Sequence, residues 1–97
     1  MMNRKIFKYT LTADDCLIRI EENAEILKVD TQGIDIVMWA IVRVDEPPVQ
    51  RRFVSVNTGD RIHDWLDKGC HLGTVTVDGI VWHIFEAATR YRDAAVR

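Results

Sequence analysis

The sequence predicts a mainly β protein: a small antiparallel β-sandwich or barrel of six to seven strands, with one short helix near residues 60–68. Three observations lead to this prediction. Most of the 97-residue chain consists of short runs in which apolar and polar residues alternate, the period of a half-buried strand. Turn-forming residues separate these runs, and only one segment has the apolar spacing of a helix. The two long helices of a ferredoxin-like α+β fold are missing.

The first half of the chain predicts four strands. Their bounds are residues 5–11, 17–20, 26–31 and 34–44. Gln32-Gly33 separates the last two, and this connection is short enough for a hairpin whose glycine supplies a positive φ. Every residue from 36 to 42 is apolar, which predicts a central strand covered on both faces.

A fifth strand follows a proline-rich loop. Pro47 and Pro48 remove two backbone donors, so the fourth strand has to end before them. The alternation resumes over residues 51–58 and predicts two opposite faces. One face carries Val54 and Val56, and the other carries Arg51, Phe53, Ser55 and Asn57.

The single helical signal lies after this strand. Ile62, Trp65 and Leu66 have helical spacing, Asp60 is placed to be the N-cap, and Gly69 is placed to be a left-handed C-cap. The segment is only about two turns long, so packing has to hold it in place.

The last hairpin is the clearest local signal. Asp78-Gly79 between residues 72–77 and 80–86 matches the two-residue loop of a type I′ turn. We therefore expect one β-rich domain over residues 1–86. Residues 87–97 change to an Ala- and Arg-rich composition, which predicts a tail that is either a short helix or frayed.

Composition excludes several classes of protein. The net charge is −2, so the chain lacks the broad attraction to nucleic acid or anionic lipid of a basic domain, and we expect neither direct nucleic-acid binding nor membrane binding. Cys16 and Cys70 lack disulfide or CxxC spacing and predict a reducing compartment. We see no signal peptide and no apolar stretch of membrane-spanning length, so we expect a cytoplasmic protein.

No motif for catalysis, metal or cofactor is present. Candidate metal ligands occur without a recurring paired spacing, so we expect no metal site. They are Asp60, His63, Asp64, Cys70, His71 and His83. Ser55 lies inside a predicted strand without a nucleophile elbow, and neither common glycine-rich phosphate motif occurs. We therefore expect no catalytic residue and no cofactor.

Aromatic and cationic side chains suggest a ligand-binding site. Flat aromatic rings stack on bases, and arginine forks bind phosphate or carboxylate. The candidate ligand-binding residues are Arg43, Arg51, Trp82 and His83. Arg51 and Arg52 are neighbours in a strand, so only one of them can point into a pocket.

An acidic tract suggests a second kind of surface. Its candidate partner-binding residues are Asp14, Asp15, Glu21, Glu22 and Glu25. These carboxylates could take the place of nucleic-acid phosphates on a basic protein partner. The tract follows a basic start containing Arg4, Lys5 and Lys8, and this asymmetry could also guide association into a homo-oligomer.

Several segments, read in order, resemble a family of small phage and prophage proteins of unknown function. The segments are Lys5-Ile6-Phe7-Lys8-Tyr9, Ile26-Leu27-Lys28-Val29, Met38-Trp39-Ala40-Ile41-Val42, Asn57-Thr58-Gly59-Asp60-Arg61-Ile62, Leu72-Gly73-Thr74 and Val81-Trp82-His83-Ile84-Phe85-Glu86. The resemblance covers most of residues 4–86 and implies a short-stranded fold and no known reaction. Residues 13–25 depart from the pattern, and the residues from 87 onward lie outside it.

The hypothesis that follows is a non-enzymatic phage accessory protein that inhibits a bacterial defence system in the host cytoplasm. It would bind either a host protein through the acidic tract or a nucleotide signal through the arginines and Trp82. An alternative is a structural or assembly accessory of the virion. A third hypothesis is a small hydrolase that uses Cys16 or a metal at His63.

Overall fold

The computed structural model describes residues 3–91, without the side chains of residues 67–68 and 89–91. It contains seven strands and one short 3-10 helix, so the prediction of a mainly β fold is confirmed. The strands are β1 (Arg4–Leu11), β2 (Asp15–Glu21), β3 (Glu25–Gln32), β4 (Asp35–Arg43), β5 (Pro48–Asn57), β6 (Cys70–Val77) and β7 (Ile80–Tyr91), and the helix is η1 (Asp64–Lys68).

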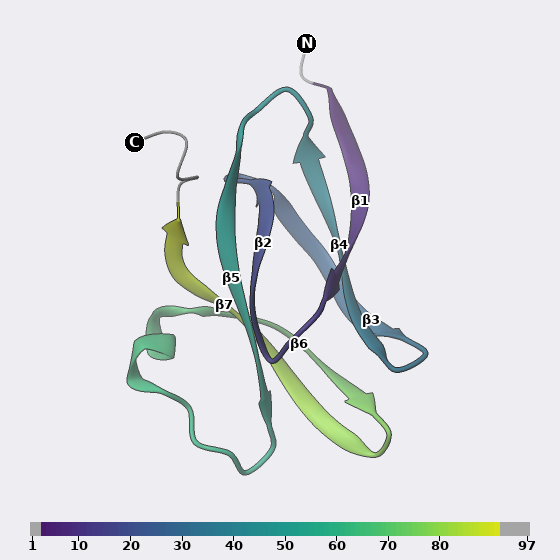
Figure 1. Ribbon diagram of the computed structural model, residues 1–97, viewed down its shortest axis with the longest axis vertical. Helices are drawn as coiled ribbons and strands as arrows, with labels where there is room; N and C mark the ends of the chain where they lie inside the picture. The colour runs from purple at the N-terminus through teal and green to yellow at the C-terminus, as the bar shows by residue number, and fades with distance from the viewer. Residues whose placement is uncertain (1–2, 92–97) are drawn as a thin grey trace.

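The strands form two antiparallel sheets rather than a closed barrel (Figure 1). The three-stranded sheet has the order β1-β4-β3, and the four-stranded sheet has the order β2-β5-β7-β6. The chain changes sheet between β1 and β2, between β2 and β3, and between β4 and β5, so each sheet combines distant parts of the sequence. The two sheets pack most closely where β3 meets β6, and they make few contacts where β1 meets β2.

Local turn chemistry confirms both predicted hairpins. Gly33 has φ +62° as the first residue of the two-residue loop between Gln32 and Asp35. Asp78 and Gly79 have φ +50° and +79°, the two positive values that a type I′ loop needs. These loops set the registers of the β3–β4 and β6–β7 pairs, because a two-residue loop leaves one way to align its flanking strands.

The core lies between the two sheets. Phe53, Ile20, Met38 and Ile84 are the largest side chains that are almost completely buried, and they come from both sheets. The predicted central strand is β4, the middle strand of its sheet. Its outward-facing Trp39 is half-buried, whereas Val37, two residues before it on the same face, is buried.

The helical segment differs from its prediction. The 3-10 helix begins after His63 instead of Asp60, because the Asp60 N–H closes a turn onto the Asn57 carbonyl at 3.1 Å. Gly69 has φ −83° and is not a left-handed cap. It is needed for space instead, since a Cβ there would lie 2.6 Å from the backbone oxygen of Glu86. Leu66, 3% exposed, anchors the segment on the outer face of the four-stranded sheet.

The last strand continues through the expected domain boundary. β7 ends at Tyr91, five residues past the boundary expected at residue 86, and Ala87 is buried against Leu66 and Val54. Residues 92–97 of the expected tail lie outside the described residues. In the described part of the chain, no helix has the length and apolar character needed to cross a membrane.

Candidate functional site

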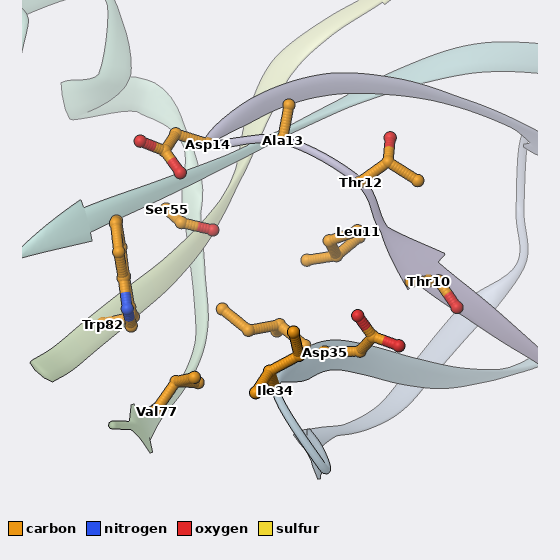
Figure 2. A pocket seen from close by; sticks show the side chains of 11 residues that line it. Thr10, Leu11, Thr12, Ala13, Asp14, Ile34, Asp35, Ser55, Val77 and Trp82 are labelled. Atoms are coloured by element: carbon orange, nitrogen blue, oxygen red, sulfur yellow. The ribbon is translucent and has the colours of Figure 1, made fainter. Parts of the chain in front are cut away.

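An open groove lies between the two sheets at one end of the sandwich (Figure 2). It has a volume of about 370 Å³, and we call it the end groove. Its lining residues are Thr10, Leu11, Thr12, Ala13, Asp14, Ile34, Asp35, Ile36, Ser55, Val77 and Trp82. Five strands and two connections contribute to it, so the groove exists only when both sheets are assembled.

Register explains why these residues meet. Leu11 at the end of β1 pairs with Ile36 at the start of β4, which brings the β3–β4 hairpin beside the connection from β1 to β2. The Ser55 N–H donates to the Asp14 carbonyl at 2.7 Å and fixes this connection to β5. Trp82 is the register partner of both Asn57 and Val75, so it lies on the central part of the four-stranded sheet.

Trp82 forms an aromatic wall of the groove. The side chain is half-buried and packs on the core cluster that contains Phe53 and Ile84, which holds the indole in place. Figure 2 shows Asp14 and Ser55 near Trp82, and Asp35 on the side of the groove formed by the β3–β4 hairpin. An indole next to carboxylates is an arrangement that attracts cations.

The electrostatics of the end groove are acidic. Asp14 and Asp35 each contribute a carboxylate, and among the described residues that line the groove there is no Lys, Arg or His. Threonine and serine hydroxyls add neutral donors and acceptors. The groove can therefore receive an ammonium or guanidinium group, with its aliphatic stem against Ile34 and Val77.

Arg51, expected to bind ligand, has a structural role instead. It is 3% exposed and forms a two-pronged ion pair with Glu86, with Nε to Oε2 at 2.6 Å and Nη2 to Oε1 at 2.7 Å. Its Nη1 donates to the carbonyls of Ala24 at 2.8 Å and Glu21 at 3.2 Å. The prediction that Arg51 contacts a ligand is therefore wrong, because its side chain is used inside the fold.

The other expected ligand-binding residues do not gather around Trp82. His83 follows Trp82 in β7 and points to the opposite face, where its Nε2 lies 2.7 Å from Thr58 Oγ1 and its Nδ1 lies 3.1 Å from Thr74 Oγ1. Arg43 ends β4 and pairs in register with Arg4. The four residues thus belong to separate places, and only Trp82 lines the end groove.

The acidic tract is divided between the two ends of β2. Asp14 lines the end groove, whereas Glu22 and Glu25 follow the other end of the strand. Glu21 is 5% exposed, and its carboxylate accepts the backbone N–H groups of Asn23 and Arg43, so it stabilises the β2–β3 turn. These carboxylates do not form one continuous patch, because the seven-residue strand β2 lies between Asp14 and Glu22.

Asp15 belongs to an aromatic and charged cluster on the outer face of the four-stranded sheet. It accepts from Arg52 Nε at 2.7 Å, and this hydrogen bond lowers the pKa of the Asp15 carboxyl. The Arg52 guanidinium lies 4.2 Å from the Trp65 ring centroid, and the His63 ring stacks parallel to Trp65 at 6.0 Å. Sequence reasoning missed this cluster, because η1 had to fold against the four-stranded sheet before Trp65 could meet Arg52 of β5.

The thiols and histidines form no site with the chemistry of a metal centre. In the described residues no three His, Cys, Asp or Glu side chains gather closely enough to hold a metal ion. Cys16 is half-buried beside the core, and burial raises the pKa of its thiol. Cys70 is exposed at the start of β6.

Comparison with known proteins identifies a family but no function. No curated protein and no solved structure matches the chain. One family model, described as a domain of unknown function (DUF7352), matches residues 2–94. This match spans both sheets and every residue of the end groove, and the chain therefore belongs to the DUF7352 family.

Proposed function

We propose that this protein is a non-enzymatic binding protein whose end groove takes a lysine or arginine side chain of a protein partner. One observation carries the proposal: Trp82, Asp14 and Asp35 line the same groove, and its described lining residues include no Lys, Arg or His. An indole face and two carboxylates are complementary to a cationic head group, and the apolar lining is complementary to its stem.

The same charges argue against the nucleotide form of the hypothesis. A phosphate in the end groove would meet two carboxylates, which repel it. Arg51, the arginine that was to bind the phosphate, is paired with Glu86 in the core. Recognition of a basic protein surface is therefore the better supported of the two forms.

The biological setting of the proposal comes from the resemblance to small phage proteins. In that setting the partner is a protein of the bacterial host cytoplasm, and a nucleic-acid-binding component of a defence system has the required basic surface. Asp14 and Asp35 would take the place of phosphates on that surface. A virion accessory is the alternative, and sedimentation with mature particles would reveal it.

A peptide titration tests the binding chemistry directly. We would titrate the ¹⁵N-labelled protein with short peptides that differ only in a central arginine, lysine or neutral citrulline. We expect the indole N–H signal of Trp82 to shift with the arginine and lysine peptides and to stay unchanged with citrulline. Equal shifts with citrulline, or no shift with any peptide, would contradict the proposal.

Matched variants locate the effect. Asp14→Asn and Asp35→Asn should each weaken the arginine peptide about tenfold, because one charge-assisted hydrogen bond contributes about 1.5 kcal/mol or more. Asp45→Asn and Asp78→Asn remove the same charge from the β4–β5 and β6–β7 loops and should leave affinity unchanged. A similar loss in all four variants would mean that net charge, not the groove, attracts the peptide.

A further inference from the structure

β1 is an edge strand with a row of unpaired backbone groups. It has β4 on one side and no described strand on the other. The Asn3 carbonyl accepts the Val44 N–H at 3.0 Å, so backbone groups of odd-numbered residues in this strand face β4. Those of the even-numbered residues, such as Ile6 and Lys8, point away from the sheet. Such a row can pair with another extended chain.

A cleft of about 370 Å³ runs beside this edge. It separates β1 from β2, the edge strand of the other sheet, and Figure 1 shows the two strands diverging from their short connection. Phe7 and Tyr9 of β1 line one side and Ile20 of β2 lines the other. Phe7 remains 43% exposed, so the cleft offers apolar area to a chain lying along the edge.

The charge along this edge selects the occupant. β1 carries Arg4, Lys5 and Lys8 and no carboxylate. Of the two glutamates in the cleft lining, Glu21 accepts backbone N–H groups of Asn23 and Arg43, which compensates its charge. The positive row opposes pairing with β1 of a second copy, since like charges on adjacent strands repel. It favours a segment that carries carboxylates.

We infer that the β1 edge is a docking site for an extended acidic segment of a protein partner, which adds to the three-stranded sheet as a fourth strand. Main-chain hydrogen bonds to Ile6, Lys8 and Thr10 fix the segment, as in other strand-addition complexes. Alternate side chains of the segment enter the cleft against Phe7 and Tyr9. Its carboxylates lie on the outer face of the sheet, where the exposed Lys8 ammonium exchanges its hydrogen bond to Gln32 Oε1, 2.8 Å in the unbound protein, for a carboxylate. This site meets the end groove only at Thr10 and has the opposite charge preference.

Fluorescence anisotropy with designed peptides tests the charge preference. The probe is a labelled nine-residue peptide that alternates glutamate and valine, and the comparison peptide alternates lysine and valine. We expect only the glutamate peptide to bind. Lys8→Glu should weaken it about tenfold, because reversing one charge replaces an attraction of roughly 0.5–1 kcal/mol with a similar repulsion.

Lys28→Glu is the matched control. Lys8 and Lys28 are the two register partners of Trp39, but Lys28 lies on β3 at the opposite edge of the sheet. Its reversal should change affinity less than twofold. Equal losses in both variants, or equal binding of the lysine peptide, would overturn the inference.

Hydrogen exchange supplies the backbone test, which does not depend on any variant folding. With the glutamate peptide bound, the amides of Ile6, Lys8 and Thr10 should gain protection, whereas those of Phe7 and Tyr9 are already protected by β4. Absence of this alternation would overturn the inference. Protection of the even-numbered amides without peptide, together with a dimer in sedimentation, would also overturn it and assign the edge to a second copy.

Discussion

The buried pair of Arg51 and Glu86 gives the sharpest test of how the fold is stabilised. Glu86→Gln keeps the shape of the side chain but removes its charge. The guanidinium, 3% exposed, would then lose its ion-pair partner among the described residues and would face an amide donor in place of one carboxylate oxygen. Its remaining acceptors, the carbonyls of Glu21, Glu22 and Ala24, are neutral.

The expected loss is large for a domain of this size. Removing one member of a buried pair costs about 3–5 kcal/mol, because the other charge stays desolvated. The whole free energy of unfolding of a small domain is about 5–15 kcal/mol. Asp15→Asn removes the same chemistry from an exposed pair, in which the Asp15 side chain is 48% exposed, and should cost less than about 1 kcal/mol.

Urea unfolding followed by circular dichroism measures both variants. With a slope of about 1–3 kcal/mol per molar urea, a loss of about 4 kcal/mol lowers the midpoint by more than 1 M. Asp15→Asn should shift it by only a fraction of that amount. If Glu86→Gln shifts the midpoint no more than Asp15→Asn does, the pair is solvated in solution and our account of the core is refuted.

Three further predictions follow from individual contacts. Gly69→Ala should destabilise the fold by about 1–3 kcal/mol in the same urea assay, because the new Cβ would lie 2.6 Å from the backbone oxygen of Glu86. An unchanged urea midpoint would contradict the packing of η1. The pKa of Asp15 is lowered in the folded protein, so its pair with Arg52 stabilises the fold above the ordinary carboxyl pKa near 4. This contribution disappears as the pH falls through the folded-state pKa of Asp15. The free energies of unfolding of the wild type and of Asp15→Asn should therefore converge in acid. Burial raises the pKa of the Cys16 thiol, so an alkylating reagent at neutral pH should label the exposed Cys70 before Cys16. Mass spectrometry maps the labelled residues, and faster labelling of Cys16 would show that the core opens there.

The alternation of apolar and polar residues predicted the strands well, because the residues on the two faces of a strand alternate along its own sequence. The alternation in residues 51–58 put Phe53 on one face and Val54 and Val56 on the other. In the structure Phe53 belongs to the core between the sheets, and Val54 and Val56 pack with Leu66 of η1. The Asp78-Gly79 loop was equally readable, since few other dipeptides adopt two positive φ values.

The site could not be read in the same way, because its residues meet only through pairing between distant strands. Asp35 joins Asp14 in the end groove because β4 pairs with β1 as well as with β3, and the pairing with β1 brings the start of β4 beside the β1–β2 connection. Arg51 looked like a ligand-binding residue because nothing near it in sequence marks Glu86, 35 residues away, as its counter-ion. Asp35 therefore escaped notice, and Arg51 was misassigned.

The separation of Arg51 from Glu86 also bears on how the protein is made. At about 5–20 residues per second, a ribosome adds the 35 residues from Arg52 to Glu86 in roughly 2–7 s. During that interval β5, whose Phe53 and Val54 belong to the core, carries two adjacent positive charges that oppose its premature association with other nascent chains. The buried ion pair cannot form before Glu86 has been added, because its two members lie on β5 and β7. We therefore expect the arginine that stabilises the finished core to oppose association of the unfinished chain until its partner has been synthesised.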